Sequence, residues 1–216
     1  MINIFETESY YKIFDDLPEL PTELLEHNDF AMAKNFKHGT QFPMSKDYIR
    51  DDGRLEAAER VSTKLSTGIL QWIHQNILPV FNDSVEKRRL MIYRRTLANE
   101  YRNFYPPHVD IGREFTLIYN VVDSGGDIIF WQQKGFPVFR DRSEGDAIRD
   151  YTSLTELCRF KSPYKKWYLL NNQVVHSVED LKTERENIQI ACFLTDPLVI
   201  DALNPIHLDK STKKII

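Results

Sequence analysis

Cysteines and long apolar runs are scarce in this sequence. Only two cysteines, Cys158 and Cys192, occur among 216 residues, and no C-x-x-C spacing is present. Both lie in apolar, strand-like stretches, which indicates buried thiols in a reducing compartment. No apolar run approaches the ~20 residues that a membrane span needs, and the start, Met1-Ile2-Asn3-Ile4, lacks the basic and apolar regions of a signal peptide. We therefore expect a cytoplasmic protein with no membrane partner.

A surplus of positive charge is also absent. The chain carries 28 basic and 32 acidic side chains, a formal net charge of -4. It therefore has no overall field that attracts phosphate backbones, and short basic clusters such as Lys87-Arg88-Arg89 are typical of solvated faces. We expect no nucleic-acid partner. The shares of hydrophobic (42%) and charged (28%) residues are typical of a compact globular protein and exclude a disordered chain.

Internal repeats, low-complexity tracts and a Pro/Gly/Ser-rich linker are absent too. A chain of 216 residues suits one domain, so we predict a single domain over residues 1–216. Within it we expect a helical N-terminal layer over 1–88, a jelly-roll core over 89–197 and a C-terminal tail over 198–216.

The longest periodic segment covers residues 55–78. Its apolar residues recur at three- and four-residue steps, which predicts one amphipathic helix. Asp51-Asp52-Gly53 would cap the start of this helix and Pro79 would end it.

Short β-rich runs separated by turn residues dominate after residue 89. Many short strands without intervening helices predict a sandwich or jelly roll with the early helices on one outer face. The fold class is therefore mainly β with N-terminal helices, an α+β chain. The charged stretch 140–151 is predicted to be a surface loop, either a solvated connection or a lid beside a site. The predicted strands cover residues 90–96, 115–122, 127–133, 137–140, 166–170, 174–177 and 187–195.

Three histidines head an H-x-D tripeptide, so this motif alone identifies nothing in a chain rich in aspartate. His27 lies in a region of helical character. His207 lies beyond the last predicted strand, with no later histidine to complete a site, and both are interpreted as surface residues. His108 instead follows two prolines that hold the chain extended where it enters the sheet. His108 and Asp110 are therefore the candidate metal ligands.

His176 lies between valines in the β-rich half of the chain. Alone, it would be interpreted as a core histidine bonded to the backbone. With His108 and Asp110 it gives two imidazoles and one carboxylate, the facial triad of non-heme iron(II) oxygenases, which leaves three coordination positions open. Zinc is the competing ion, but a zinc site of this kind would need a nearby general acid or base, and none is evident.

The order of these residues resembles the iron(II) and 2-oxoglutarate-dependent oxygenases, whose core is a double-stranded β-helix (jelly roll). The resemblance covers residues 93–196. His108-Val109-Asp110 matches the proximal H-x-D of that family, and His176 matches its distal histidine. The apolar run 115–119, followed by Gly125-Gly126 and a second apolar run, is similar to the strand, turn and strand that come after the H-x-D.

The resemblance also implies a set of residues that bind 2-oxoglutarate. Arg185, nine positions after His176, matches the basic residue that grips the far carboxylate, for which arginine offers a planar, permanently charged fork. Asn187 stands where the family often has a serine and still donates a hydrogen bond. Tyr93 or Tyr119 would supply the hydroxyl that often helps to hold the co-substrate, although both are equally typical of core tyrosines.

The implied activity is that of a hydroxylase-type dioxygenase, with Fe(II), O2 and 2-oxoglutarate as cofactor and co-substrates and with succinate and CO2 as products. The primary substrate is expected to be a small molecule, an amino acid or a peptide, and the oligomeric state is left open. Trp131, Phe104 and Tyr105 flank the proposed site, either as pocket lining or as packing.

The sequence is compatible with two other functions, and it disfavours nucleic acid as a substrate. The chain would alternatively be a catalytically silent jelly-roll binding module, or a cupin-type metalloenzyme that does not use 2-oxoglutarate and does not need Arg185. Nucleic-acid demethylases that resemble this chain carry a second arginine six positions after the first, and here that position is Ala191. We therefore expect a substrate other than nucleic acid.

Overall fold

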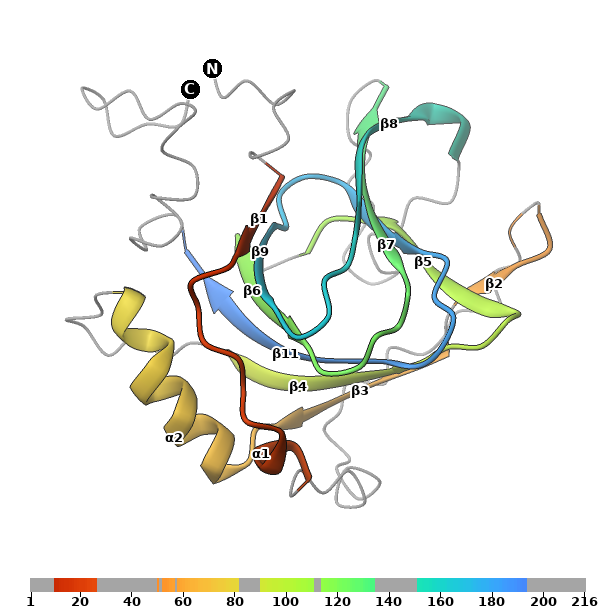
Figure 1. Cartoon of the computed structure of the whole chain (residues 1–216). Coiled ribbons are helices and arrows are strands. Elements are labelled where there is room, and N and C mark those ends of the chain that lie inside the picture. The colour runs from red at the N-terminus through yellow and green to blue at the C-terminus, as the bar shows by residue number, and fades with distance from the viewer. Residues whose placement is uncertain are drawn as a thin grey trace, which may run out of the picture.

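The computed structural model describes residues 10–26, 50, 52–56, 58–81, 90–110, 114–134 and 151–193. These residues form two facing β-sheets, with α-helices on the outer face of one of them (Figure 1). The six-stranded sheet has the order β1 (Tyr11–Phe14), β9 (Trp167–Asn171), β6 (Phe115–Asn120), β11 (Arg185–Cys192), β4 (Met91–Leu97) and β3 (Ala58–Lys64). The five-stranded sheet has the order β2 (Leu55–Glu56), β5 (Arg102–His108), β10 (His176–Glu179), β7 (Asp127–Gln133) and β8 (Leu154–Lys161).

The strands pair in antiparallel fashion except for β2, which runs parallel to β5. From β4 to β11 the chain passes repeatedly from one sheet to the other. The helices are α1 (Thr22–Glu26) and α2 (Thr67–Asn76), with short 3-10 helices at Leu78–Phe81 and Tyr151–Ser153. The described chain is therefore a mainly antiparallel, β-rich, jelly-roll-like fold with few helices. No helix in these residues is long and apolar enough to cross a membrane.

Two apolar cores lie on the two sides of the six-stranded sheet. In the outer core, Ile69 and Ile73 of α2 are fully buried against the sheet. The inner core lies between the sheets and joins Ile118 of β6 to Ile128 and Phe130 of β7. Successive side chains of a strand point to opposite faces, so each strand of the larger sheet divides its residues between the helix-packed core and the interior of the fold.

The prediction of one helix over residues 55–78 is wrong for its first half. That part forms β2 and β3, and α2 begins only at Thr67. A period of two fits the sequence from 55 to 65 as well as a helical period does, and Val61 and Thr63 are β-branched. The antiparallel pairing of β3 with β4 satisfies the backbone of this segment as a strand.

The start of α2 is fixed by Ser66 and not by the predicted 51–53 segment. Ser66 Oγ accepts a hydrogen bond from Ile69 N at 3.3 Å and so caps the helix. Gly53 instead lies in a turn with a φ of +84°, a conformation that favours glycine. The helix ends at Asn76, two residues before the predicted end at 78, and Pro79 follows in a 3-10 turn.

Most of the strands predicted after residue 89 are confirmed. β7 has the predicted bounds, and β4, β6, β9, β10 and β11 lie within three residues of theirs. Cys158 and Cys192 are buried free thiols, as expected. The layer before residue 89 is not wholly helical, because it also contains β1, β2 and β3. The predicted strand 137–140, residues 140–150 of the charged stretch and the tail 198–216 lie outside the described residues.

After residue 89, two strands of the described part, β5 and β8, were missed by the sequence patterns. β5 contains Pro106 and Pro107, which lack the N–H group that a central strand uses. The register between β5 and β10 shifts at these prolines, because β5 has one more residue than β10 between two paired positions. A bulge of this kind tolerates proline and re-aims the side chains beside it.

On the outer face of β10, the buried Glu179 carboxylate forms ion pairs with two partly exposed arginines. Glu179 Oε2 lies 2.8 Å from Arg50 Nη1 and 3.5 Å from Arg54 Nη2, and Tyr151 donates a hydrogen bond to Glu179 Oε1 at 3.3 Å. Burial raises the pKa of Glu179 above its ordinary value, although the two arginines oppose this shift. These contacts tie two distant segments to the strand that carries His176.

The outer core yields a stability prediction. Ile73→Ala removes a fully buried side chain between α2 and the sheet, so we expect it to lower the free energy of unfolding by about 2 to 5 kcal/mol. His74→Ala, at the exposed neighbouring position, is the matched control and should change it by less than about 0.5 kcal/mol. Urea unfolding of both variants measures this. Equal effects would contradict the packing of α2 on the sheet.

Candidate metal centre

The pairing of β5 with β10 brings His108 and His176 together. His108 is the last residue of β5, His176 is the first of β10, and the two are direct partners in the register of these strands. Asp110 follows His108 by two residues, and its backbone N–H donates to the Asn172 carbonyl at 3.2 Å. This bond holds the residues after β5 next to the turn that leads into β10.

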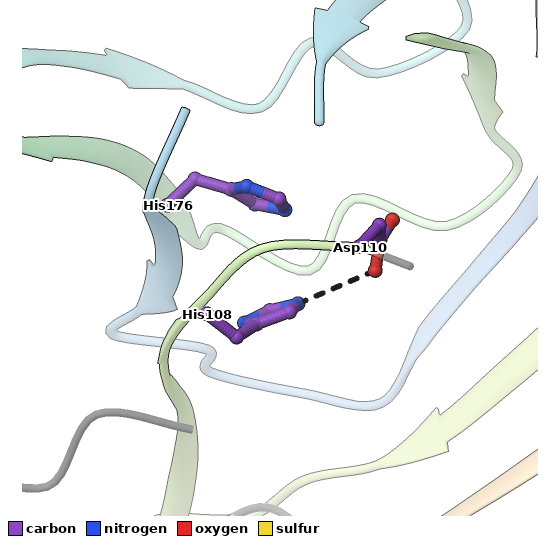
Figure 2. Close-up of side chains that lie close together, drawn as sticks. All are labelled: His108, Asp110 and His176. Carbon is purple, nitrogen blue, oxygen red and sulfur yellow. Dashed lines mark ion pairs between the residues drawn. The ribbon is translucent and has the colours of Figure 1, made fainter. Parts of the chain in front are cut away.

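The three side chains point toward one another (Figure 2). The imidazole centroids of His108 and His176 are 4.6 Å apart, and His108 Nε2 lies 3.7 Å from Asp110 Oδ1. One ligand atom from each of the three residues lies within 4.8 Å of the others. His176 is buried, whereas His108 and Asp110 are partly exposed. The structure therefore assembles the three residues that the sequence singles out.

The backbone fixes the same tautomer in both histidines. His108 Nδ1 lies 2.8 Å from the Pro106 carbonyl oxygen, and His176 Nδ1 lies 2.9 Å from the Val174 carbonyl oxygen. A carbonyl oxygen only accepts, so each Nδ1 carries a proton, and Nε2 is the nitrogen that has a free lone pair in the neutral imidazole. Histidine ligands of metals are oriented by a second hydrogen bond of this kind. Two imidazoles that ligate through Nε2, together with a carboxylate, are a donor set that fits a divalent transition metal.

The three residues line a pocket between the sheets that encloses about 510 Å³ of empty space, part of it open to solvent. Its walls combine apolar side chains of the inner core with polar ones from β4, β6 and β11. The other lining residues are Arg94, Thr96, Tyr105, Thr116, Ile118, Ile128, Leu170, Asn172, Val178, Arg185 and Gln189.

Arg185, which the sequence predicts to bind a carboxylate, lies in this pocket. It is only 6% exposed, and its Nη2 donates to the Tyr168 hydroxyl at 2.9 Å. Arg185 Nε is buried without a hydrogen-bond partner, and no carboxylate pairs with this guanidinium among the described residues. A buried cation without a counterion is costly. The pocket is therefore suited to an anion at this point.

The tyrosines expected to contact the co-substrate, Tyr93 and Tyr119, lie on the other face of the sheet. Both belong to the core packed against the helices. Tyr93 donates a hydrogen bond to Glu186 Oε2 at 2.8 Å, and Tyr119 accepts one from Leu20 N at 3.3 Å. Burial raises the pKa of both hydroxyls. The expectation is corrected because each occupies an outward position in the alternation of its strand.

Two other tyrosines, neither of which the sequence assigns to 2-oxoglutarate, lie at or next to the pocket: Tyr105 lines it, and Tyr168 contacts its buried arginine. Tyr168 contacts Arg185, and Tyr105 donates a hydrogen bond to Thr96 Oγ1. Tyr105 was expected only to flank the site. The alternation along β9 would have indicated the inward face of Tyr168 once another residue of that strand was placed there.

The remaining predicted residues fall in different places. Asn187 is buried and its Oδ1 accepts a hydrogen bond from Gln189 Nε2 at 2.9 Å, so it supports the pocket wall. Phe104 lies under the guanidinium of Arg50, and Trp131 donates to Ser177 Oγ at 2.8 Å. Neither of these two aromatic residues is among the pocket-lining residues. His27 and His207 lie outside the described residues.

No family model matches the chain, and no match is found among curated proteins. Solved structures similar to it include an oxidoreductase of the 2OG-Fe(II) oxygenase family from Burkholderia pseudomallei. It shows 16% identity and a TM-score of 0.36 over 60% of this chain and 56% of that chain. The chain thus spans little more than half of that protein.

Two further similar structures cover more of the chain. The non-heme alpha ketoglutarate dependent carbocyclase SnoK from nogalamycin biosynthesis shows 10% identity and a TM-score of 0.45, over 84% of this chain and 79% of that chain. AviO1 from Streptomyces viridochromogenes Tue57 shows 14% identity and a TM-score of 0.42, over 84% of this chain and 88% of that chain. Likenesses at this level do not assign a family, so the function has to be derived from the residues of the site.

Metal binding is the first property to test. We expect wild-type protein to bind about one iron(II) per chain. His176→Ala should bind it at least about 100-fold more weakly, because even the loss of a residue that only orients a ligand lowers metal affinity by about 10- to 100-fold. His74→Ala, at an exposed histidine of α2, is the matched control. Anaerobic equilibrium dialysis measures both.

The rival H-x-D motifs are tested in the same way. His27→Ala and His207→Ala should leave iron affinity unchanged. Loss of binding in either variant, with retention in His176→Ala, would move the centre away from His108 and Asp110.

Proposed function

We propose that this chain is a non-heme iron(II) and 2-oxoglutarate-dependent dioxygenase with a double-stranded β-helix core. It would hydroxylate a small molecule, an amino acid or a peptide. One observation carries the proposal: the His108, Asp110 and His176 side chains converge in the same pocket that holds the buried Arg185 guanidinium without a carboxylate partner in the described chain.

The metal ligands and the cation lie at different depths of this pocket. The backbone N–H of Asp110 donates a hydrogen bond to the Asn172 carbonyl, and the Asn172 side chain donates one to Thr116. Thr116 is the strand partner of Ala191, which lies near the end of β11. Arg185 is the first residue of β11, so its Cα lies at the opposite end of the strand. A ligand with one anionic group at the metal and another at Arg185 would therefore span the pocket. A dicarboxylate meets this requirement.

His108, Asp110 and His176 would hold the ion, and the Pro106 and Val174 carbonyls would keep both imidazoles in the tautomer that ligates through Nε2. When bound, iron(II) and 2-oxoglutarate would supply oxygen activation, driven by oxidative decarboxylation of the 2-oxo acid to succinate and CO2.

Arg185 would bind and orient the far carboxylate of 2-oxoglutarate through its planar fork. The Tyr168 hydroxyl, which accepts from Arg185 Nη2, would hold that fork in place. Apolar neighbours such as Ile118 and Val178 would exclude water from the pair and so strengthen it.

Two alternatives are less well supported by the site. A silent binding module has no need for a complete donor set with both histidine tautomers fixed. A cupin-type enzyme without 2-oxoglutarate would have the metal ligands but no use for Arg185. Nucleic acid is a poor candidate substrate, because Ala191 stands where the demethylases have their second arginine.

The direct test is a succinate-release assay on iron-loaded protein with 2-oxoglutarate and a panel of amino acids, peptides and small acids. Turnover that depends on both iron and 2-oxoglutarate is expected. Iron binding without any succinate release, coupled or uncoupled, would favour the alternatives.

Removal of the buried Arg185 cation should weaken the binding of 2-oxoglutarate but not the binding of the metal. Loss of one partner of a buried charge pair costs roughly 3 to 5 kcal/mol, so Arg185→Ala should weaken binding by about two to three and a half orders of magnitude. Arg185→Lys should recover only part of this loss, because a point charge does not reproduce two parallel hydrogen bonds. Anaerobic calorimetric titration of the metal-loaded variants measures both, and metal affinity should stay unchanged. An unaltered titration of Arg185→Ala would remove Arg185 from the site.

The reassignment of the tyrosines makes a separate prediction. Tyr168→Phe removes the hydroxyl that accepts from Arg185, and a hydrogen bond to a charged group contributes about 1.5 to 3 kcal/mol. We expect it to weaken 2-oxoglutarate binding by about 10- to 100-fold. Tyr93→Phe, a buried tyrosine on the helix-packed face, is the matched control and should leave it unchanged. The opposite ranking would restore Tyr93 as the co-substrate residue.

A further inference from the structure

The buried Arg185 guanidinium is held by a network of polar side chains formed by Tyr168, Ser162 and Asn120. Arg185 Nη2 donates to the Tyr168 hydroxyl at 2.9 Å, and that hydroxyl lies 3.3 Å from Ser162 Oγ. Ser162 Oγ in turn accepts a hydrogen bond from Asn120 Nδ2 at 2.7 Å. All of these residues are buried, so the hydrogen bonds of the network are shielded from competition by water.

The three residues of this network do not themselves line the pocket. Arg185 is among the described residues that line it, whereas Tyr168, Ser162 and Asn120 are not. They therefore lie behind the arginine as seen from a ligand in the pocket. Their effect on a bound anion would pass through the position of the Arg185 guanidinium.

Ser162 connects the network to both sheets. It lies in the segment between β8 of the five-stranded sheet and β9 of the six-stranded sheet. Its backbone N–H donates to the Gly126 carbonyl at 3.1 Å, directly before β7, while its side chain contacts Asn120 at the end of β6. β7 pairs with β10, which carries His176. Ser162 therefore relates the sheet of the metal ligands to the sheet that carries Arg185.

Asn120 holds the segment around Ser162 in one position. Its Nδ2 also donates to the Pro163 carbonyl at 2.7 Å, and its backbone carbonyl accepts a hydrogen bond from Lys165 N at 3.1 Å. Lys165 has a φ of +54°, an uncommon conformation for a residue other than glycine. These contacts fix the segment 162–165 against the end of β6.

The position of the Arg185 guanidinium decides which length of diacid fits between it and the metal ligands. An arginine side chain has several rotatable bonds, so an unrestrained guanidinium would adjust to diacids of different lengths. A guanidinium held by a buried network does not adjust in this way. One methylene group too many or too few would then lower the affinity by about 10- to 200-fold.

We propose that Ser162 is a positioning residue, which together with Asn120 fixes the Arg185 guanidinium through Tyr168 and so sets the chain length of the dicarboxylate that the pocket binds. This inference rests on the proposed function, because it takes 2-oxoglutarate as the ligand of Arg185. Its support is the continuous path of hydrogen bonds from Asn120 to the guanidinium, together with the placement of Ser162 between the two sheets.

The test compares 2-oxoglutarate with 2-oxoadipate, which has one more methylene group. Both acids are titrated calorimetrically into manganese(II)-loaded protein, so that binding is read without turnover. Wild-type protein should bind 2-oxoglutarate about 10- to 200-fold more tightly than 2-oxoadipate. Ser162→Ala should weaken 2-oxoglutarate binding by about 3- to 10-fold. It should leave 2-oxoadipate binding unchanged, because that acid does not fit the fixed guanidinium, so the ratio of the two affinities should fall.

Further variants show whether Ser162 acts through Tyr168. The double variant Ser162→Ala/Tyr168→Phe should bind 2-oxoglutarate as Tyr168→Phe alone does, because the contact between the two hydroxyls is already lost. Asn120→Ala should have the same two effects as Ser162→Ala. Ser124→Ala, at a buried serine outside the network, is the matched control and should change neither affinity. Manganese affinity should stay unchanged in every variant.

Several results would overturn the proposal. They are wild-type protein that binds both acids equally, Ser162→Ala and Asn120→Ala proteins that behave as wild type, and additive losses in the double variant. Equal weakening of both acids in Ser162→Ala would also overturn it, because a general loosening of the fold has no preference for one chain length. Wild-type protein that binds neither manganese nor 2-oxoglutarate would instead contradict the proposed function.

Discussion

His108 and His176 face each other because β5 and β10 pair in one particular register, and the candidate centre depends on that pairing. The period of a strand is two residues, so a shift of one residue would turn His176 to the outer face and bring Ser177 inward. The bulge at Pro106 and Pro107 provides both the register and the carbonyl that fixes His108. On the outer side, the ion pairs of Glu179 hold β10 in place. The position of the donor atoms is thus a consequence of backbone pairing.

The six-stranded sheet separates stability from chemistry by the alternation of its strands. On β4, Tyr93 packs into the helix-covered core while Arg94 and Thr96 line the pocket. On β11, Ile188 belongs to that core while Arg185 lies inside the pocket. The helices bury the outer face of this sheet and so hold its strands in place. They therefore support the polar groups on the inner face without approaching the site. This division also explains how two arginines are retained within an apolar fold.

Much of this arrangement follows from the sequence, and the exceptions have physical causes. Short apolar runs bounded by turn residues gave the bounds of β7 and nearly those of β6, and the choice of His108 over the other H-x-D motifs rested on the prolines before it. Residues 55–65 were misread as helix because local periodicity was ambiguous and the pairing with β4 is not local. Tyr93 and Tyr119 were misplaced because their residue type says nothing of the face they occupy, whereas Tyr168 is identified only by its contact with Arg185.

We propose that the triad and Arg185 together bind iron(II) and 2-oxoglutarate as one unit. The most direct measurement is the visible absorption spectrum of anaerobic, iron(II)-loaded wild-type protein as 2-oxoglutarate is added. We expect a weak charge-transfer band that saturates at about one equivalent per chain, with no band from 2-oxobutyrate, which lacks the far carboxylate, at the same concentration. Iron-loaded protein that develops no band with 2-oxoglutarate, or an equal band with both acids, would contradict it.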